Sequence, residues 1–319
     1  MKKILSIMLV FLAILILTGC DSADYDKAME LLESGNYLEA KAIFVELGDY
    51  KDSSDKIKVC ENAYQYEQAS IAYTAGNYKS AISQYRKLGD YKDSVSQIKQ
   101  CYVALHGEDA YNLIMSLEIG DTVEYGTFEQ DHDGTTTDEK ILWHVIDKQG
   151  ESVLLLSDKI LWYDYFSDEF VFSKSFTYTE SRFNNWLNNS FYNVAFTDEE
   201  KQLILENNPS YAGKVFLLSK EEAEKLSRSI LKCTDTQHAR KEARKNNVKP
   251  HESIWALRTL FTTYKAWDAG IVNYLTVTER GRIFEGNDND FKAGESGFPC
   301  GNPDSYTGIR PAIWISLNS

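Results

Sequence analysis

The chain has 319 residues, of which 34 are basic and 48 are acidic, so its formal net charge at neutral pH is −14. This charge argues against nucleic acid as a partner, because the phosphates would repel the protein. The length that remains after an export signal, about 300 residues, suits two domains rather than one.

The first residues carry the pattern of an export signal. Lys2 and Lys3 precede the apolar run Ile4–Leu17, which is shorter than the roughly 20 residues that a membrane-spanning helix needs. The run ends in Leu-Thr-Gly-Cys at residues 17–20. This tetrapeptide resembles the lipobox of bacterial prolipoproteins, in which small residues before the cysteine fit the cleaving peptidase.

We therefore expect a signal peptide at residues 1–19 and a lipidated tether at residues 20–23. The Cys20 thiol would carry a diacylglyceryl group, and two or three acyl chains would hold the protein firmly to the membrane. An ordinary secreted protein with a chance cysteine is the alternative. The lipoprotein interpretation places the chain on the extracytoplasmic face of the cell membrane.

The other four cysteines do not form a C-x-x-C motif. Cys60 and Cys101 occupy matching places in an internal repeat, so we expect them to be small core residues. Cys233 and Cys300 could form a disulfide outside the cell or remain free thiols, and the free thiols are favoured.

An internal repeat with an offset of 41 residues fills residues 24–118. Three blocks recur at this offset: residues 35–37 (Gly-Asn-Tyr) at 76–78, residues 47–53 (Leu-Gly-Asp-Tyr-Lys-Asp-Ser) at 88–94, and Cys60 at Cys101.

Each repeat has the apolar spacing of a helix. Tyr37, Ala40, Phe44 and Leu47 lie on one helical face. We expect the aspartates that follow each such run to cap the next helix, so that each unit is a helical hairpin. The pattern resembles the second half of a tetratricopeptide repeat, although its period exceeds the usual length of about 34 residues.

The repeats allow two functions. Stacked hairpins can form a concave groove for a peptide, lined by exposed tyrosines such as Tyr66 or Tyr73, which would make the repeats a protein-interaction scaffold. They can also act as a spacer that lifts the C-terminal domain off the membrane. Two units make only a small groove, so the spacer is favoured.

The pattern of the chain changes at residue 119, and residues 119–319 predict an α+β domain. Strands come first, helices follow, and strands return towards the end. The expected strands are 122–128, 141–146, 153–157, 215–219 and several from Trp255 to Ile315, and the expected helices are 181–189, 198–207 and 220–228.

This domain resembles the bacterial domain-of-unknown-function family numbered 6273, over nearly all of residues 120–317. The name of the family implies no reaction. The resemblance implies a fold similar to the C-type-lectin-like fold, which formylglycine-generating enzymes share. The sequence departs from the family pattern at Asp235, His238 and Ala256. The resemblance rests on residues 120–130, 143–146, 154–157, 183–188, 191–196, 214–219, 255–258 and 308–313.

No residue pattern predicts a catalytic site. The chain lacks H-E-x-x-H, G-x-S-x-G, a phosphate loop and G-x-G-x-x-G, and its five histidines are scattered. His144 is expected to be a half-buried partner on a strand. An enzyme like the formylglycine generators would need a cysteine pair, for which only Cys233 and Cys300 remain, so we expect no enzyme.

Aromatic and arginine side chains are the candidates for ligand binding. Trp255, Trp267 and Arg258 predict an aromatic-lined cleft that could bind a glycan or wall polymer. Arg258 and Arg310 lie in apolar strands and need partners, for which Asp or Glu on the loops are the expectation. If they open into a cleft, they are the candidates for binding an anion.

Two loops are rich in oxygen ligands. Asp131 and Asp133 lie in one acidic turn, and Asn287, Asp288 and Asp290 lie in a late loop. Either loop could hold calcium, which prefers six or more oxygens, although a solvated turn is favoured in each case. No other cofactor is expected. The candidate ligands are a glycan, a wall polymer or a protein.

Overall fold

The computed structural model describes residues 21–134, 139–167, 176–206, 213–245, 253–263, 271–284, 298–299 and 306–319. The chain divides into two compact units, Met1–Tyr111 and Asn112–Ser319. No helix in the described ranges is long and apolar enough to cross a membrane.

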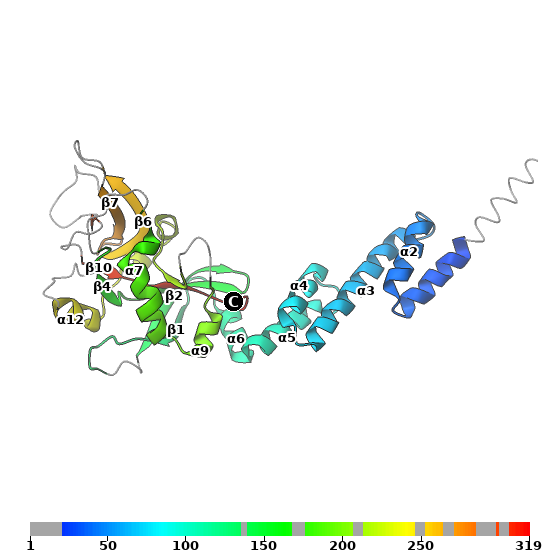
Figure 1. Ribbon diagram of the computed structural model, residues 1–319, viewed down its shortest axis with the longest axis horizontal. Coiled ribbons are helices and arrows are strands. Elements are labelled where there is room, and N and C mark those ends of the chain that lie inside the picture. The colour runs from blue at the N-terminus through cyan, green and yellow to red at the C-terminus, as the bar shows by residue number, and fades with distance from the viewer. Residues whose placement is uncertain are drawn as a thin grey trace, which may run out of the picture. The chain divides into compact units, whose positions relative to one another are not determined.

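Helical hairpins build the N-terminal unit (Figure 1). A first helix covers residues 21–33. It is followed by α2 (Tyr37–Leu47), α3 (Ser53–Thr74), α4 (Tyr78–Leu88), α5 (Ser94–His106) and α6 (Glu108–Ser116). Cys60 and Cys101 are 1% and 0% exposed, which confirms them as core residues.

The turn between α2 and α3 contacts the first helix through several side chains. Lys51 has a positive φ of 50°, and its ammonium lies 4.1 Å from the centre of the Tyr25 ring. The Tyr25 hydroxyl donates to Asp52. Tyr50 packs edge-on against the same ring, at 6.1 Å between centroids. The residues of this turn therefore hold the hairpin to the helix that precedes it.

The same contacts recur 41 residues later. Lys92 has a φ of 51° and lies 4.6 Å from the Tyr66 ring, and the Tyr66 hydroxyl donates to Asp93. We expected these aspartates to cap helices, and that prediction is wrong for Asp52 and Asp93. Neither side chain makes a capping hydrogen bond, because each carboxylate accepts the tyrosine hydroxyl instead.

The C-terminal unit is an α+β domain with two sheets, as the sequence predicts. The first sheet is antiparallel, in the order β1 (Thr122–Thr127), β2 (Lys140–Gln149), β3 (Ser152–Ser157), β11 (Ala312–Ser316) and β5 (Val215–Phe216). The second has the order β4 (Trp162–Asp164), β10 (Thr307–Ile309), β6 (Trp255–Thr263), β7 (Ile271–Val277) and β8 (Ile283–Phe284), with β9 (Phe298–Pro299) also paired to β7.

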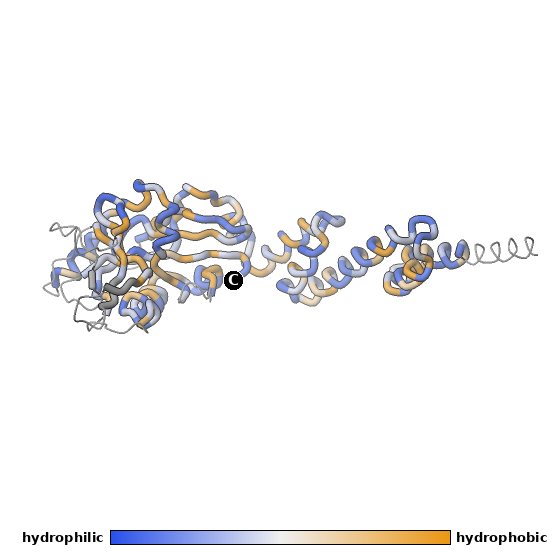
Figure 2. Tube along the Cα trace, turned by 90° about the horizontal axis from the view of Figure 1, so that it is seen from above, coloured by the Kyte–Doolittle hydropathy of each residue, from blue (hydrophilic) through white to orange (hydrophobic). Residues whose placement is uncertain are grey.

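Strand β10 joins the second sheet by one parallel pairing, Gly308 with Trp255, and the sheet is otherwise antiparallel. Side chains from both sheets meet in one core cluster, for example Leu156 and Trp314 from the first and Leu257 and Val277 from the second. In Figure 2, orange hydrophobic stretches alternate with blue hydrophilic ones along the tube of this unit.

Short helices fill the connections of this unit. They are η1 (Tyr178–Glu180), α7 (Arg182–Asn185), the π-helix η2 (Trp186–Phe191), α8 (Tyr192–Ala195), α9 (Asp198–Leu203), α10 (Lys220–Ala223), α11 (Arg228–Leu231) and α12 (Gln237–Lys245).

Some expected elements differ from those observed. The strand expected at 215–219 is shorter, the helix expected at 198–207 ends at Leu203, and the helix expected at 220–228 is two short helices. Ser227 accepts a hydrogen bond from the backbone N–H of Ile230, so a new helix starts there. Helix α12 was not expected, because its residues are mostly charged.

Candidate functional site

A cleft of about 800 Å³ opens on the C-terminal unit. The loop after β1, the start of β2, the turn after β3 and the start of α12 surround it. Its side chains are mainly polar and of both charges, and include Gln130, Asp131, Glu139, Asp158, Asp235 and Arg240.

Asp235 is the most buried carboxylate of the cleft, at 7% exposure. A backbone bridge between Asp235 and Ile160 fixes its position. Its carboxylate accepts the Tyr163 hydroxyl at 3.1 Å and lies 3.7 Å from Nε of Arg240. Burial, and then the charge of Asp235, raise the pKa of Tyr163, so the phenol keeps its proton.

Other pairs hold the opposite walls of the cleft. His144 Nε2 lies 2.8 Å from Asp158, so the expectation of a half-buried, partnered histidine is confirmed. The backbone N–H of Asp131 donates to both oxygens of Glu139 at 3.2 Å. Burial, and then the hydrogen bond with the Asp131 side chain, raise the pKa of Glu139.

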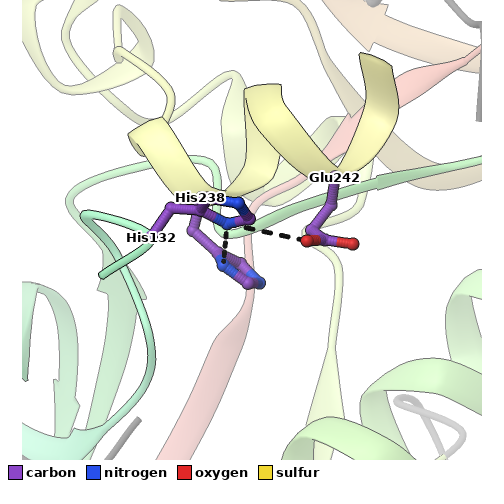
Figure 3. A group of neighbouring side chains, drawn as sticks. All are labelled: His132, His238 and Glu242. Carbon is purple, nitrogen blue, oxygen red and sulfur yellow. Dashed lines mark hydrogen bonds and ion pairs between the residues drawn. The ribbon is translucent and has the colours of Figure 1, made fainter. Parts of the chain in front are cut away.

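A histidine–carboxylate cluster lies beside the cleft, on the same loop and helix (Figure 3). His132 Nδ1 is 3.1 Å from His238 Nδ1 and 3.6 Å from a Glu242 oxygen. His238 and Glu242 are one turn apart on α12, whereas His132 belongs to the loop after β1. Ligand-type atoms of all three lie within 4.8 Å of one another.

Aromatic rings surround His238. Trp162 lies 5.8 Å from its ring and Phe128 lies 6.1 Å away, between centroids. Trp162 in turn stacks on Trp186 at 5.5 Å with an interplanar angle of 11°. Burial against these groups lowers the pKa of His238, whereas the charges of Glu129 and Glu242 act in the opposite direction.

The acidic turn that was a calcium candidate forms a second group of carboxylates. Glu129, Asp131 and Asp133 each offer an oxygen within 4.8 Å of the others. Glu129 is 3% exposed, and the backbone N–H of Asp133 donates to its carboxylate at 3.1 Å. The turn therefore adds negative charge beside the two imidazoles.

Trp255 lies in the core and not in an exposed cleft, so the aromatic-lined cleft expected around it is wrong for this residue. Its side chain is 0% exposed, and its indole N–H donates to the Leu231 carbonyl at 3.1 Å. Burial is favourable here because the ring carries a large apolar surface and its one polar group finds a partner.

Arg258 forms an ion pair with a glutamate, as expected, although Glu222 lies on helix α10 and not on a loop. Its guanidinium contacts both oxygens of Glu222, at 2.6 and 2.9 Å, and donates to the Leu217 carbonyl at 2.5 Å. Glu222 also accepts the backbone N–H of Ser219 and so caps α10. The contacts of Arg258 are thus those of a structural ion pair.

Arg310 has different partners from those expected. It is 0% exposed and donates to the carbonyls of Ser157 and Ile230, each at 2.7 Å, and its guanidinium lies 5.0 Å from the centre of the Trp255 ring. Backbone carbonyls and an aromatic face, rather than Asp or Glu, hold this charge, and the side chain does not open into a cleft.

Several candidates lie outside the described residues, namely Cys20, Trp267, Asn287, Asp288, Asp290 and Cys300. Cys233 is described as a free cysteine, and burial raises the pKa of its thiol to about 11. A thiol with such a pKa is protonated at neutral pH and is a poor nucleophile.

The histidine–carboxylate cluster was missed because its parts are far apart in sequence. The helical spacing of His238 and Glu242 could have indicated a shared face, but nothing in the sequence connects them with His132, which is 106 residues away from His238. The sequence departs from its family pattern at two residues of these sites: Asp235 lies in the cleft, and His238 lies in the cluster.

Two sheets around one core, with a polar cleft and a histidine–carboxylate cluster at their loops, define the C-terminal unit as an α+β domain with a candidate binding site. Residues 150–317, more than half of the chain, match the family described as domain of unknown function (DUF6273). The chain belongs to this family, whose description indicates no enzyme class. No curated protein and no solved structure matches the chain.

Proposed function

We propose that the protein is a lipid-anchored extracytoplasmic protein whose C-terminal domain recognises a ligand in the cleft beside α12. The lipobox at Cys20 supports the anchor. The cleft supports recognition, because its volume of about 800 Å³ lies within the range of small-ligand sites and polar groups converge on it. This cleft is the observation that carries the proposal.

The chemistry of the cleft favours a neutral glycan. Asp131, Glu139, Asp158 and Asp235 face it together with Lys140, Lys159 and Arg240. Carboxylates, amides and cationic groups of this kind can each exchange hydrogen bonds with sugar hydroxyls. A polyanionic wall polymer would meet these carboxylates and a chain with net charge −14.

A glycan and wall-polymer binding array with the full chain, in detergent, tests this proposal. Asp235→Asn keeps the size of the side chain but removes its charge, and Arg240→Gln removes the facing cation. We expect either change to weaken binding of the recognised glycan at least about tenfold, since each removes a charge-assisted hydrogen bond. Parallel arrays with calcium and with a chelator test the acidic loops.

Arg228→Gln is the matched control, because Arg228 is exposed on α11 and does not line the cleft. It should leave binding unchanged. Binding that survives both cleft variants, or no binding to any glycan or wall polymer, would contradict recognition at this site.

A second candidate function is a protein-interaction scaffold formed by the helical repeats. A pocket of about 490 Å³ lies on the N-terminal unit and includes Tyr73, Lys99, Val103 and Glu108. Such a pocket could hold a side chain of a partner protein. Site-specific photo-crosslinking in cells from position Val103 should then give one discrete adduct that Tyr73→Ala abolishes, and a diffuse or unchanged pattern would count against the scaffold.

A further inference from the structure

We propose that His132, His238 and Glu242 bind a divalent transition-metal ion, zinc being the best match. The site would be separate from the cleft described above, although both use the loop after β1 and helix α12. The proposal goes beyond ligand recognition and does not depend on it.

The positions of the ligand atoms suit a metal. Zinc–nitrogen bonds of about 2.0–2.1 Å in a tetrahedral site place neighbouring ligand atoms about 3.3 Å apart. The observed separations, 3.1 Å between the two Nδ1 atoms and 3.6 Å from His132 Nδ1 to Glu242, lie on either side of that value. A simple hydrogen bond between the imidazoles would account for the first contact but not for the converging carboxylate.

The donor types also select the metal. Two imidazoles and one carboxylate suit zinc and its neighbours in the first transition series, whereas calcium and magnesium prefer oxygen ligands alone. Three protein ligands leave one tetrahedral position open for water or for a donor atom of a bound molecule.

Helix α12 and the loop after β1 hold the three candidate metal ligands in place. His238 and Glu242 are one turn apart on a helix of nine residues, so their side chains leave the same face. The backbone N–H of His238 donates to the Gln130 carbonyl at 2.8 Å, which fastens the loop to the start of α12. His132 has a positive φ of 67°, a conformation that few residues other than glycine adopt.

The surrounding charges favour a cation. Metal binding requires neutral imidazoles and an ionised carboxylate. The buried Glu129 carboxylate and the neighbouring Asp131 and Asp133 add negative charge to the same loop.

Lys245 is the group that would compete with the metal. Its ammonium pairs with the Glu242 oxygen that faces His132. The Lys245 side chain is 60% exposed, so it can swing into water when a metal takes its place. Removal of Lys245 should therefore strengthen metal binding.

Calorimetric titration of the full chain in detergent with zinc chloride tests the site. We expect one zinc ion per chain, with the affinity reduced at least about tenfold in His132→Ala and in Glu242→Gln. Loss even of a group that only orients a metal ligand costs about 10–100-fold, and loss of a ligand should cost no less. Lys245→Gln should bind zinc more tightly than the unchanged chain.

His144→Ala is the matched control, since it removes a histidine that also has a carboxylate partner, Asp158, but no second imidazole. It should keep the affinity of the unchanged chain. Thermal unfolding without zinc, followed by tryptophan fluorescence, checks that each variant is folded. The proposal is wrong if the chain binds no zinc, if the two ligand variants bind as the unchanged chain does, or if His144→Ala loses binding equally.

Discussion

Arg310 shows at the scale of single residues how this domain keeps a buried charge. The guanidinium donates to two backbone carbonyls and lies against the Trp255 ring, with no exposure to water. Hydrogen bonds to a charged group are stronger than those between neutral groups. The arginine thereby ties the end of β3 and the end of α11 to the strand that follows β10.

We expect Arg310→Met to lower the free energy of unfolding of the C-terminal unit by about 2–4 kcal/mol, because two buried carbonyls would lose their donors. Urea unfolding followed by tryptophan fluorescence measures this, and Arg228→Met, on the exposed surface of α11, is the control. Equal midpoints for the two variants would mean that the guanidinium contributes little.

Two glycines with positive φ allow a test of close packing. A Cβ at Gly126 would lie 2.6 Å from the Ala195 carbonyl oxygen and 2.7 Å from the Phe196 ring, whereas one at Gly150 would meet nothing within 4 Å. Gly150→Ala should cost about 1–2 kcal/mol of unfolding free energy from its backbone conformation alone. Gly126→Ala should cost about 1–3 kcal/mol more from overpacking.

The same urea transition compares these two glycine variants. If Gly126→Ala is no less stable than Gly150→Ala, the loop after α8 can move away from β1 without cost, and the close approach of the two segments is not a constraint on the fold.

At the residue scale, the sequence predicts pairing but not the identity of the partner. The sequence indicates that an arginine such as Arg310 needs partners if it is buried, but it led us to expect an exposed cleft around Trp255. The observed partners, the carbonyls of Leu231, Ser157 and Ile230, are set by tertiary structure. Carbonyls are present at every residue, so no sequence pattern indicates which ones an arginine will find.

At the scale of elements, the turns of the helical repeat hold neighbouring helices together. The Tyr66 hydroxyl donates to Asp93, while Lys92 lies over the same ring. Tyr25, Asp52 and Lys51 repeat the arrangement. Each hairpin is thus held to the preceding helix by side chains from its turn.

The hydrogen bond between Tyr66 and Asp93 makes the repeat sensitive to alkali. It is the main cause that raises the pKa of Tyr66 to about 12. The folded-state pKa is above the unfolded value of about 10, so this stabilisation is complete below pH 10 and disappears as the pH rises to about 12. The same bond lowers the pKa of Asp93, so the stabilisation that depends on the ionised carboxylate is lost only in acid.

Thermal unfolding followed by circular dichroism should therefore separate the unchanged chain from Tyr66→Phe at pH 8, and the difference should vanish above pH 12. Tyr73→Phe, which alters a tyrosine of the same helix packed edge-on against Tyr78, is the control. A gap between the unchanged chain and Tyr66→Phe that persists at pH 12 would exclude this bond as the source of the pH dependence.

Elements with a clear period were the most predictable. Helix α2 follows the spacing of Tyr37, Phe44 and Leu47, and strand β3 follows the apolar run that begins at Val153. Helix α12 could not be found in this way, because its side chains are mostly charged and only Ala239 and Ala243 are buried on it. The candidate site escaped prediction because it depends on this helix.

At the scale of the whole molecule, the chain combines a helical N-terminal unit with an α+β C-terminal unit. All six tryptophans follow residue 142, so tryptophan fluorescence reports on the C-terminal unit alone. The formal charge of −14 favours solubility and repels anionic lipid, so a covalent anchor is the simplest way for such a chain to stay at a membrane.

The lipobox predicts a lipid anchor at Cys20. We expect the mature chain to begin at Cys20 and its N-terminal peptide to carry the added mass of two or three acyl chains, because one chain alone binds a membrane only marginally. Mass spectrometry of the N-terminal peptide measures both features. Cys20→Ala should abolish the lipid mass and the amino terminus at residue 20, whereas Cys60→Ala should change neither. If Cys20 is unmodified in the mature chain, the first twenty residues direct export without lipidation and the lipoprotein prediction is wrong.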